Sequence, residues 1–158
     1  MDKKYFLTRL VSLDRSYYDF RRDWRQLNYF FLPYQARFLT NEVNKTKSSK
    51  KIVDSTPILA VRDFSSGIMS GATSPARKWF RVGIAGFRKK QTSHSVKEWT
   101  AEVSELFRDI YNSSNIYMNF PILYQHLGVF GIAVMSLHEN FDNVIRTNIL
   151  PIGSYRIA

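Results

Sequence analysis

This chain of 158 residues contains no cysteine, which excludes disulfide bonds, thiolate catalysis and zinc sites built on cysteine ligands. It also lacks any apolar run that approaches the roughly 18 residues needed to cross a bilayer as a helix, so we expect no membrane span. Near the N-terminus, Arg9 interrupts the apolar run and no small-residue cleavage site follows it. A secretory signal peptide is therefore not expected.

Catalytic motifs are missing as well. The histidines His94, His126 and His138 show no metal-binding spacing, and Asp142 stands where a metalloprotease motif starting at His138 would need its second histidine. The sequence has no Walker loop, nucleophile elbow or catalytic pair of carboxylates. We expect a protein that is not an enzyme and that uses neither a cofactor nor a metal.

What the chain does contain is apolar and basic. Apolar residues make up 44% of the sequence and aromatic residues 15%, which predicts a packed core, and the length favours a single domain over residues 1–158. Residues 1–94 carry 19 Lys and Arg against 7 Asp and Glu, whereas residues 95–158 carry 4 against 6. A basic half of this size favours an anionic neighbour, whether nucleic acid, membrane surface or acidic protein.

The most regular helical pattern runs from Leu10 to Phe31. Its apolar residues follow a 3-4 spacing at positions 10, 13, 17, 20, 24, 27 and 31, and Pro33 is expected to end the helix. The stripe is typical of a helix lying on its own domain, and a coiled-coil seam has the same spacing.

A second helix is predicted after Thr56-Pro57, where the threonine hydroxyl is a candidate cap and proline suits the first helical position. One face of this helix is apolar, at Ile58, Val61, Phe64, Ile68 and Ala72. The other is a narrow, nearly bare flank that includes Gly67, Ser70 and Gly71. Glycine inside a helix costs about 0.5–1 kcal/mol relative to alanine, so we expect another backbone to pack against this flank.

Ser74-Pro75 is expected to end that helix, and residues 77–84 alternate as a strand with Trp79 and Phe80 as its apolar anchors. Two polar, basic loops flank this region. Solvated loops are the simpler interpretation of both; the candidates for contact with a nucleic-acid backbone are Lys47, Lys50, Lys51, Arg88, Lys89 and Lys90.

The later part of the chain is predicted as two helices and a small sheet. Ser95 and Glu98 have capping-box spacing before an amphipathic helix that reaches about Asn112. A further helix over residues 115–130 is implied by the family resemblance given next; because of Pro121, we expect its regular part to start near Phe120, with Pro121 in the first turn, or else the helix to contain a kink. Strands are expected at 132–137, at 144–150 and from Tyr155 onward, with a tight turn at 151–154. The fold class is α+β, mostly helical, with three long helices and a small β-sheet.

Three stretches carry a family resemblance. The run from Gly67 to Phe80, GIMSGATSPARKWF, resembles the signature segment of the portal proteins of short-tailed phages, the head-to-tail connecting family. Asn115-Ile116-Tyr117 through Phe130-Gly131, and Leu150 to Tyr155, resemble two further motifs of that family in the same order. Portal subunits of this family are several times longer, so the resemblance implies an N-terminal, wing-like part without the stem, clip and C-terminal regions.

The resemblance implies a structural virion protein. Family members form a dodecameric ring at the unique capsid vertex, through which duplex DNA is packaged and ejected. Implied partners are other portal subunits, capsid and scaffolding proteins, the terminase and tail adaptor proteins, with no membrane. The implied location is the virion, and the host cytoplasm during assembly. From the bare helix flank, its end and the apolar anchors after it, the residues that we predict for packing or assembly are Gly67, Ser70, Gly71, Pro75, Trp79 and Phe80.

Two other functions remain open from the residues themselves. The basic half is also typical of a nucleic-acid-binding module that forms no ring, and such a module binds duplex DNA with a steep salt dependence. An adaptor or scaffold protein without DNA contact would oligomerise and show no DNA affinity.

Overall fold

The computed structural model describes residues 3–33, 54–84 and 93–157. These parts contain four helices and one antiparallel hairpin: α1 (Lys3–Phe31), α2 (Thr56–Ala72), α3 (His94–Ser113), α4 (Ile116–Phe130), β1 (Val134–Asn140) and β2 (Val144–Leu150). The predicted α+β class with a small sheet is confirmed. The helix count differs, since α4 is a full helix beside the three predicted long ones.

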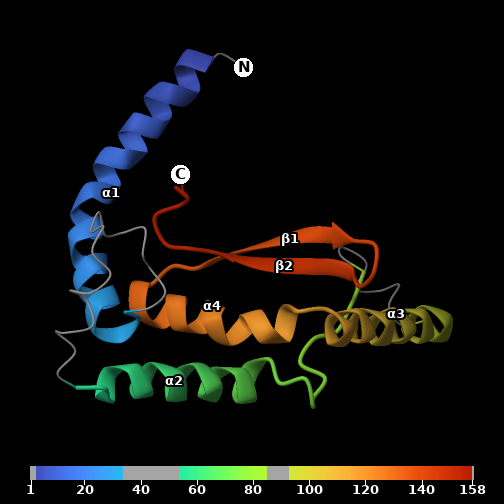
Figure 1. Ribbon diagram of the computed structural model, residues 1–158. Helices are drawn as coiled ribbons and strands as arrows, with labels where there is room; N and C mark the ends of the chain where they lie inside the picture. The colour runs from blue at the N-terminus through green and yellow to red at the C-terminus, as the bar shows by residue number, and fades with distance from the viewer. Residues whose placement is uncertain (1–2, 34–53, 85–92, 158) are drawn as a thin grey trace.

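Helix α4 lies in the middle of the molecule. In Figure 1, α2 runs along one side of it and the β1–β2 hairpin covers the opposite side. Its sequence explains this position, because nearly every turn of α4 presents a large apolar side chain and the helix carries no charged residue other than the titratable His126. Ile116, Phe120 and Phe130 are all buried.

Several predicted helix starts need correction. Helix α1 begins at Lys3, seven residues before the predicted stripe, and α4 begins at Ile116 rather than near Phe120, so Pro121 lies inside it. Burial of α4 on two sides outweighs the roughly 3 kcal/mol that an interior proline costs. Helix α3 begins at His94, so Ser95 lies within the helix and forms no capping box.

The start of α2 also differs from the prediction. The Thr56 hydroxyl donates a hydrogen bond of 2.8 Å to the Asp54 carboxylate instead of capping the helix, and the Thr56 backbone N–H donates to the same carboxylate oxygen at 3.0 Å. These bonds hold the pKa of Asp54 below its usual value. The predicted helix end is close to the observed one, since α2 stops at Ala72, before Pro75.

The β-structure is smaller than predicted. Strand β2 has the predicted bounds of 144–150, and β1 runs to Asn140, beyond the predicted end at Leu137; Val134 pairs with Leu150 and Asn140 with Val144. Residues 77–84 and 155–157 are not strands, so the predicted strands there are wrong. Among the described residues, no strand pairs with the second edge of β2, and side chains at the start of α4 bond to that edge instead.

The main core gathers around the C-terminal end of α1. Trp24, Leu32, Val61, Phe130 and Ile152 form one buried cluster. Ile152 is 1% exposed because the predicted turn at 151–154 forms: the Ser154 N–H donates to the Pro151 carbonyl at 3.1 Å, and Gly153 adopts φ 91°. That positive φ favours glycine over any other residue.

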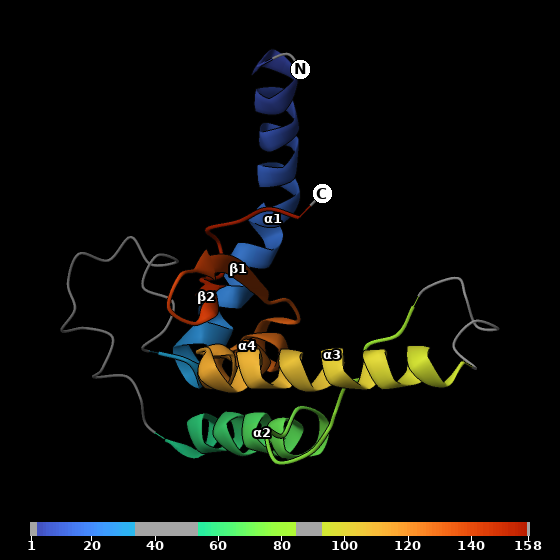
Figure 2. The same cartoon turned by 90° about the vertical axis from the view of Figure 1, so that its right-hand side faces the viewer.

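The N-terminal half of α1 and most of α3 lie away from this core. Figure 1 shows α1 rising at one end of the molecule and α3 extending from the other, and in Figure 2 the N-terminal half of α1 stands well above the rest of the fold. The predicted apolar stripe of α1 is therefore buried only towards the C-terminal end of the helix. Trp24 is buried, whereas Leu10 and Phe20 are 47% and 58% exposed.

Candidate assembly surfaces

The signature segment holds the end of α2 through an arginine. The last carbonyls of a helix have no partner inside the helix and carry partial negative charge. The Arg77 guanidinium folds back to donate hydrogen bonds to the carbonyls of Ser70 and Gly71, the latter at 3.0 Å. The turn that reverses the chain closes with the Arg77 N–H donating to the Ser74 carbonyl at 3.2 Å, and Pro75 occupies its second position.

Trp79 and Phe80 lie half-buried in an aromatic cluster between residues 79–80, α3 and α4. The Trp79 indole N–H donates to the Tyr117 hydroxyl at 3.1 Å, and its ring stacks on Tyr111 with the ring centroids 6.2 Å apart. Phe80 meets the same Tyr111 ring at 5.3 Å, and Phe120 lies edge-on to Trp79 at 5.9 Å. The segment is thus fixed by side chains, although its backbone is not a strand.

Asn115 and Asn119 fasten α4 to the free edge of β2. The Thr147 N–H donates to the Asn115 side-chain oxygen, and the Asn115 amide donates to the Thr147 carbonyl, both at 2.8 Å. Asn119 adds a 2.8 Å bond to the same carbonyl and another to the Thr147 hydroxyl. The Asn115 amide therefore pairs with Thr147 as a residue of a third strand would. Thr147 is completely buried, so these bonds satisfy groups that water does not reach.

The bare flank of α2 faces away from the described parts of the chain. Apart from the adjacent residues and the backbone of the neighbouring turns of α2, no atom of those parts lies within 4 Å of the position where a Cβ would stand on Gly67 or Gly71, and Ser70 is exposed. Close packing against this flank therefore stays a prediction, and its partner is not within these parts. The close approach occurs elsewhere: at Gly128 of α4, a Cβ would come within 3.0 Å of the Phe64 ring of α2.

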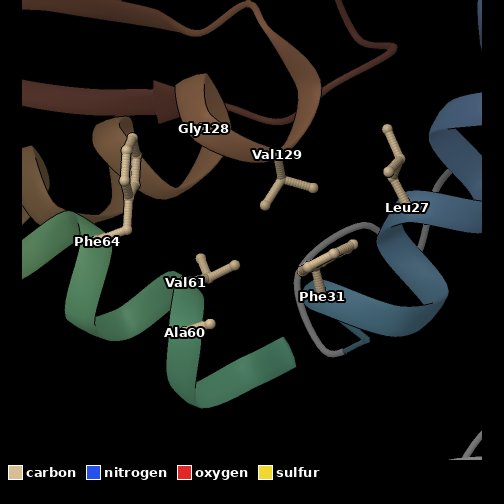
Figure 3. Close-up of a pocket in the computed structure, with 7 residues that line it drawn as sticks. All are labelled: Leu27, Phe31, Ala60, Val61, Phe64, Gly128 and Val129. Atoms are coloured by element: carbon tan, nitrogen blue, oxygen red, sulfur yellow. The ribbon is translucent and has the colours of Figure 1, made fainter. Parts of the chain in front are cut away.

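Gly128 is a packing residue that the sequence did not reveal. Figure 3 shows Phe64 and Gly128 facing each other at an apolar hollow of about 230 Å³ where α1, α2 and α4 meet. The hollow is lined by Leu27, Phe31, Ala60, Val61, Phe64, Gly128 and Val129. Since none of these side chains is polar, the hollow offers no group to orient a reactant, and we interpret it as a packing gap.

The ion pairs next to Trp79 lie at the surface of the protein. Lys78, next to Trp79, pairs with Glu105 of α3, and Arg108 pairs with the same carboxylate at 3.2 Å. The hydrogen bond from Lys78 and the charge of Arg108 hold the pKa of Glu105 below its usual value. His126 is buried in α4, and burial lowers its pKa. None of these arrangements joins a nucleophile, a base and an oxyanion site.

The predicted nucleic-acid contacts Lys47, Lys50, Lys51, Arg88, Lys89 and Lys90 all lie outside the described residues. Within the described ranges, no helix is long and apolar enough to cross a membrane. In those same ranges, no cluster of three or more histidine, aspartate or glutamate side chains is placed to hold a metal ion.

Comparison with known proteins agrees with this geometry. The chain is 39% identical over 158 residues to the portal protein of Salmonella phage epsilon15, and 33% identical to the probable portal protein of Bordetella phage BPP-1. Each match covers 99% of this chain and 28% of the relative, so the chain spans little more than a quarter of the length of these relatives.

The family model described as bacteriophage head to tail connecting protein matches residues 3–158. That range includes the segment from Gly67 to Phe80 whose side chains join α2, α3 and α4. A match over nearly the whole chain, together with the two relatives, establishes that this chain belongs to the family of bacteriophage head to tail connecting proteins.

Proposed function

We propose that this chain is a structural, wing-like unit of a phage portal subunit, acting as one domain over residues 1–158. Such subunits assemble into a ring at a single capsid vertex, and DNA enters and leaves the head through that ring. The proposal rests on the family match over residues 3–158 and on the two portal relatives. Its location is the virion, reached from the host cytoplasm during assembly.

The structural observation behind the proposal is that residues of the signature segment, from Gly67 to Phe80, connect the helices. Arg77 holds the end of α2 and Trp79 joins α3 to α4. These contacts build a scaffold rather than a reaction centre, because they are satisfied within the chain and face no polar cavity. The proposed partners are the other portal subunits, capsid and scaffolding proteins, the terminase, tail adaptor proteins and duplex DNA. No cofactor is needed for this role.

The test is to locate the protein in the phage that encodes it. Antibodies against this chain, detected with gold particles on purified virions, should label one vertex of each head, the one that bears the tail. A nonsense mutation in the gene should yield heads without DNA. Label spread over the whole shell, or virions that carry no label, would contradict the proposal.

The bare flank of α2 provides a second test within the same proposal. Gly71→Leu places a large side chain where the described chain leaves open space, so the fold should tolerate the change. If a neighbouring backbone packs there in the ring, the complete subunit carrying Gly71→Leu should fold but fail to form rings in electron micrographs. Normal rings would show that this flank is not a contact surface.

DNA contact through the basic loops is a separate part of the proposal. A nucleic-acid-binding module without ring assembly should bind duplex DNA with affinity that falls steeply with salt, because each neutralised phosphate releases counterions. A wing-like unit should bind only weakly at physiological salt. Replacing Arg88, Lys89 and Lys90 by glutamine tests whether these residues carry any of the binding. Tight, steeply salt-dependent binding would favour the module.

A further inference from the structure

Helix α1 carries a second apolar row that is separate from the stripe it uses for the core. Leu7, Val11 and Tyr18 fall within about 40° of one another round the helix and are 53%, 52% and 74% exposed. The row lies about 120° round the helix from buried Trp24. Two exposed cations, Arg15 and Arg22, border the row on one side.

Helix α3 carries a matching row with the opposite charge. Its exposed apolar residues are Trp99 and Leu106, at 54% and 58% exposure. Glu98, Glu102 and Asp109 run beside them, within about 100° of the same side of the helix, and all three are exposed. This acidic row contributes no ion pair to the described contacts, in contrast to the neighbouring Glu105.

The two rows cannot meet within one molecule as it is folded. Helix α1 stands at one end of the molecule, and α3 extends away from the core at the other end (Figure 1). Their lengths nevertheless correspond: the α1 row from Leu7 to Arg22 spans about 22 Å and the α3 row from Glu98 to Asp109 about 16 Å. Complementary surfaces at opposite ends of a subunit are what a head-to-tail contact between copies requires.

We propose that the basic apolar row of α1 on one copy docks on the acidic apolar row of α3 on the next copy. This inference rests on the proposed function, which needs a ring, and it names the surfaces that make the ring contact. The occupant is a second copy because each row has its charge complement on this same chain. Pairing of α1 with α1 would instead place Arg15 and Arg22 against each other, which is unfavourable.

A contact of two helices buries less than the roughly 1,200–2,000 Å² of a standard stable interface. We therefore expect association of the 158-residue chain to be weak, concentration-dependent and open-ended, which gives heterogeneous oligomers rather than a closed ring. The contact should also weaken with salt, since its charged groups are exposed to solvent.

Charge reversal on each helix tests the docking. One variant carries Arg15→Glu and Arg22→Glu, a second carries Glu98→Lys and Glu102→Lys, and a third carries all four changes. Sedimentation equilibrium at low salt measures the association constant of each. Either reversal alone should weaken association by about tenfold or more, because it brings like charges together. The fourfold variant, and an equimolar mixture of the first two, should recover association to within about threefold of the unchanged chain.

The matched control carries Arg9→Glu and Arg62→Glu, which change the net charge as the α1 reversal does but lie outside both rows. It should associate like the unchanged chain. The docking is wrong if the fourfold variant fails to recover, if the α3 reversal has no effect, or if the unchanged chain stays monomeric up to about millimolar concentration. The two tests can fail separately. If gold labels a single vertex but the charge-reversal variants do not behave as expected, the portal function stands and only the proposed docking surfaces are rejected.

Discussion

At the centre of the molecule, α4 is enclosed by α2 and by the hairpin, whereas the N-terminal half of α1 and the outer face of α3 are open (Figure 1). Both regions carry large apolar side chains. At the centre, hydrogen bonds between polar side chains and the backbone, such as those of Asn115 and Arg77, accompany the apolar contacts. At the ends, Leu7, Trp99 and Leu106 are exposed.

This difference separates two kinds of apolar surface. Where hydrogen bonds from polar side chains accompany an apolar contact, a substitution of one of these residues should change the stability of the single chain. Where exposed apolar rows have charged residues beside them, substitution should change association and leave the fold intact, because at most an exposed ion pair such as that of Arg22 with Asp23 is lost. The following predictions test the central region, from the largest expected effect to the smallest, and use exposed positions as controls.

The largest effect is expected for Asn115→Ala. This change leaves the buried Thr147 N–H without its acceptor and removes one of the donors to the Thr147 carbonyl. Leaving buried polar groups unpaired costs about 1–3 kcal/mol each, so the free energy of unfolding should fall by about 3 kcal/mol. Urea denaturation measures it. The control Asn112→Ala, at an exposed position of α3, should change stability by less than about 0.5 kcal/mol.

Gly128→Leu should have the next largest effect, because even a Cβ at this position would clash with the Phe64 ring. Overpacking of this kind costs about 1–3 kcal/mol, and we expect a loss of about 2 kcal/mol in thermal or urea unfolding. Gly67→Leu is the matched control. Open space surrounds Gly67, so its replacement should stabilise α2 by about 0.5–1 kcal/mol. If Gly67→Leu destabilises the chain as much as Gly128→Leu does, the proposed difference in packing between the two glycines is wrong.

Arg77→Met should lower the free energy of unfolding by about 0.5–1 kcal/mol. The change keeps much of the apolar stem and removes the guanidinium that bonds the last carbonyls of α2. Hydrogen exchange of the last turn of α2 should increase at the same time. Arg81→Met, at a nearby exposed position, should leave both measurements unchanged.

The smallest effect is a dependence on pH near neutrality. Burial lowers the pKa of His126 below its ordinary value of 6.5, so the unfolded chain takes up this proton more readily than the folded one. Stability should be complete above about pH 6.5 and should fall as the pH decreases towards the lowered folded-state pKa. Melting temperatures between about pH 8 and pH 5 measure this slope, in a range where carboxylates stay ionised. His126→Gln should flatten the slope.

Local sequence patterns predicted much of the secondary structure. The 3-4 spacing up to Phe31 predicted the long helix α1, and the strand predicted at 144–150 has the observed bounds of β2. The turn at 151–154 was also predicted correctly, because Pro151 has a fixed φ and Gly153 tolerates the positive φ that such a turn requires. These features depend on neighbours in the chain, which is why the sequence shows them.

Contacts between distant residues were the part that could not be predicted. The pairing of Asn115 with Thr147 crosses 32 residues, and that of Trp79 with Tyr117 crosses 38. No spacing rule connects such positions, and an asparagine before a helix is equally typical of an ordinary cap. The strand predicted at 77–84 is wrong for the same reason: its alternation is real, but its apolar side chains are held by α3 and α4 and no strand pairs with it.

The sequence by itself determined the helices and hairpin strands, the charge asymmetry and the family, because these follow from periodicity, composition and motifs read along the chain. Only the tertiary structure decided which glycine permits a close approach. Gly67, Gly71 and Gly128 look alike in sequence, and the difference between them is whether a ring such as that of Phe64 lies opposite. Packing is a property of two surfaces, and the sequence of one helix describes only one of them.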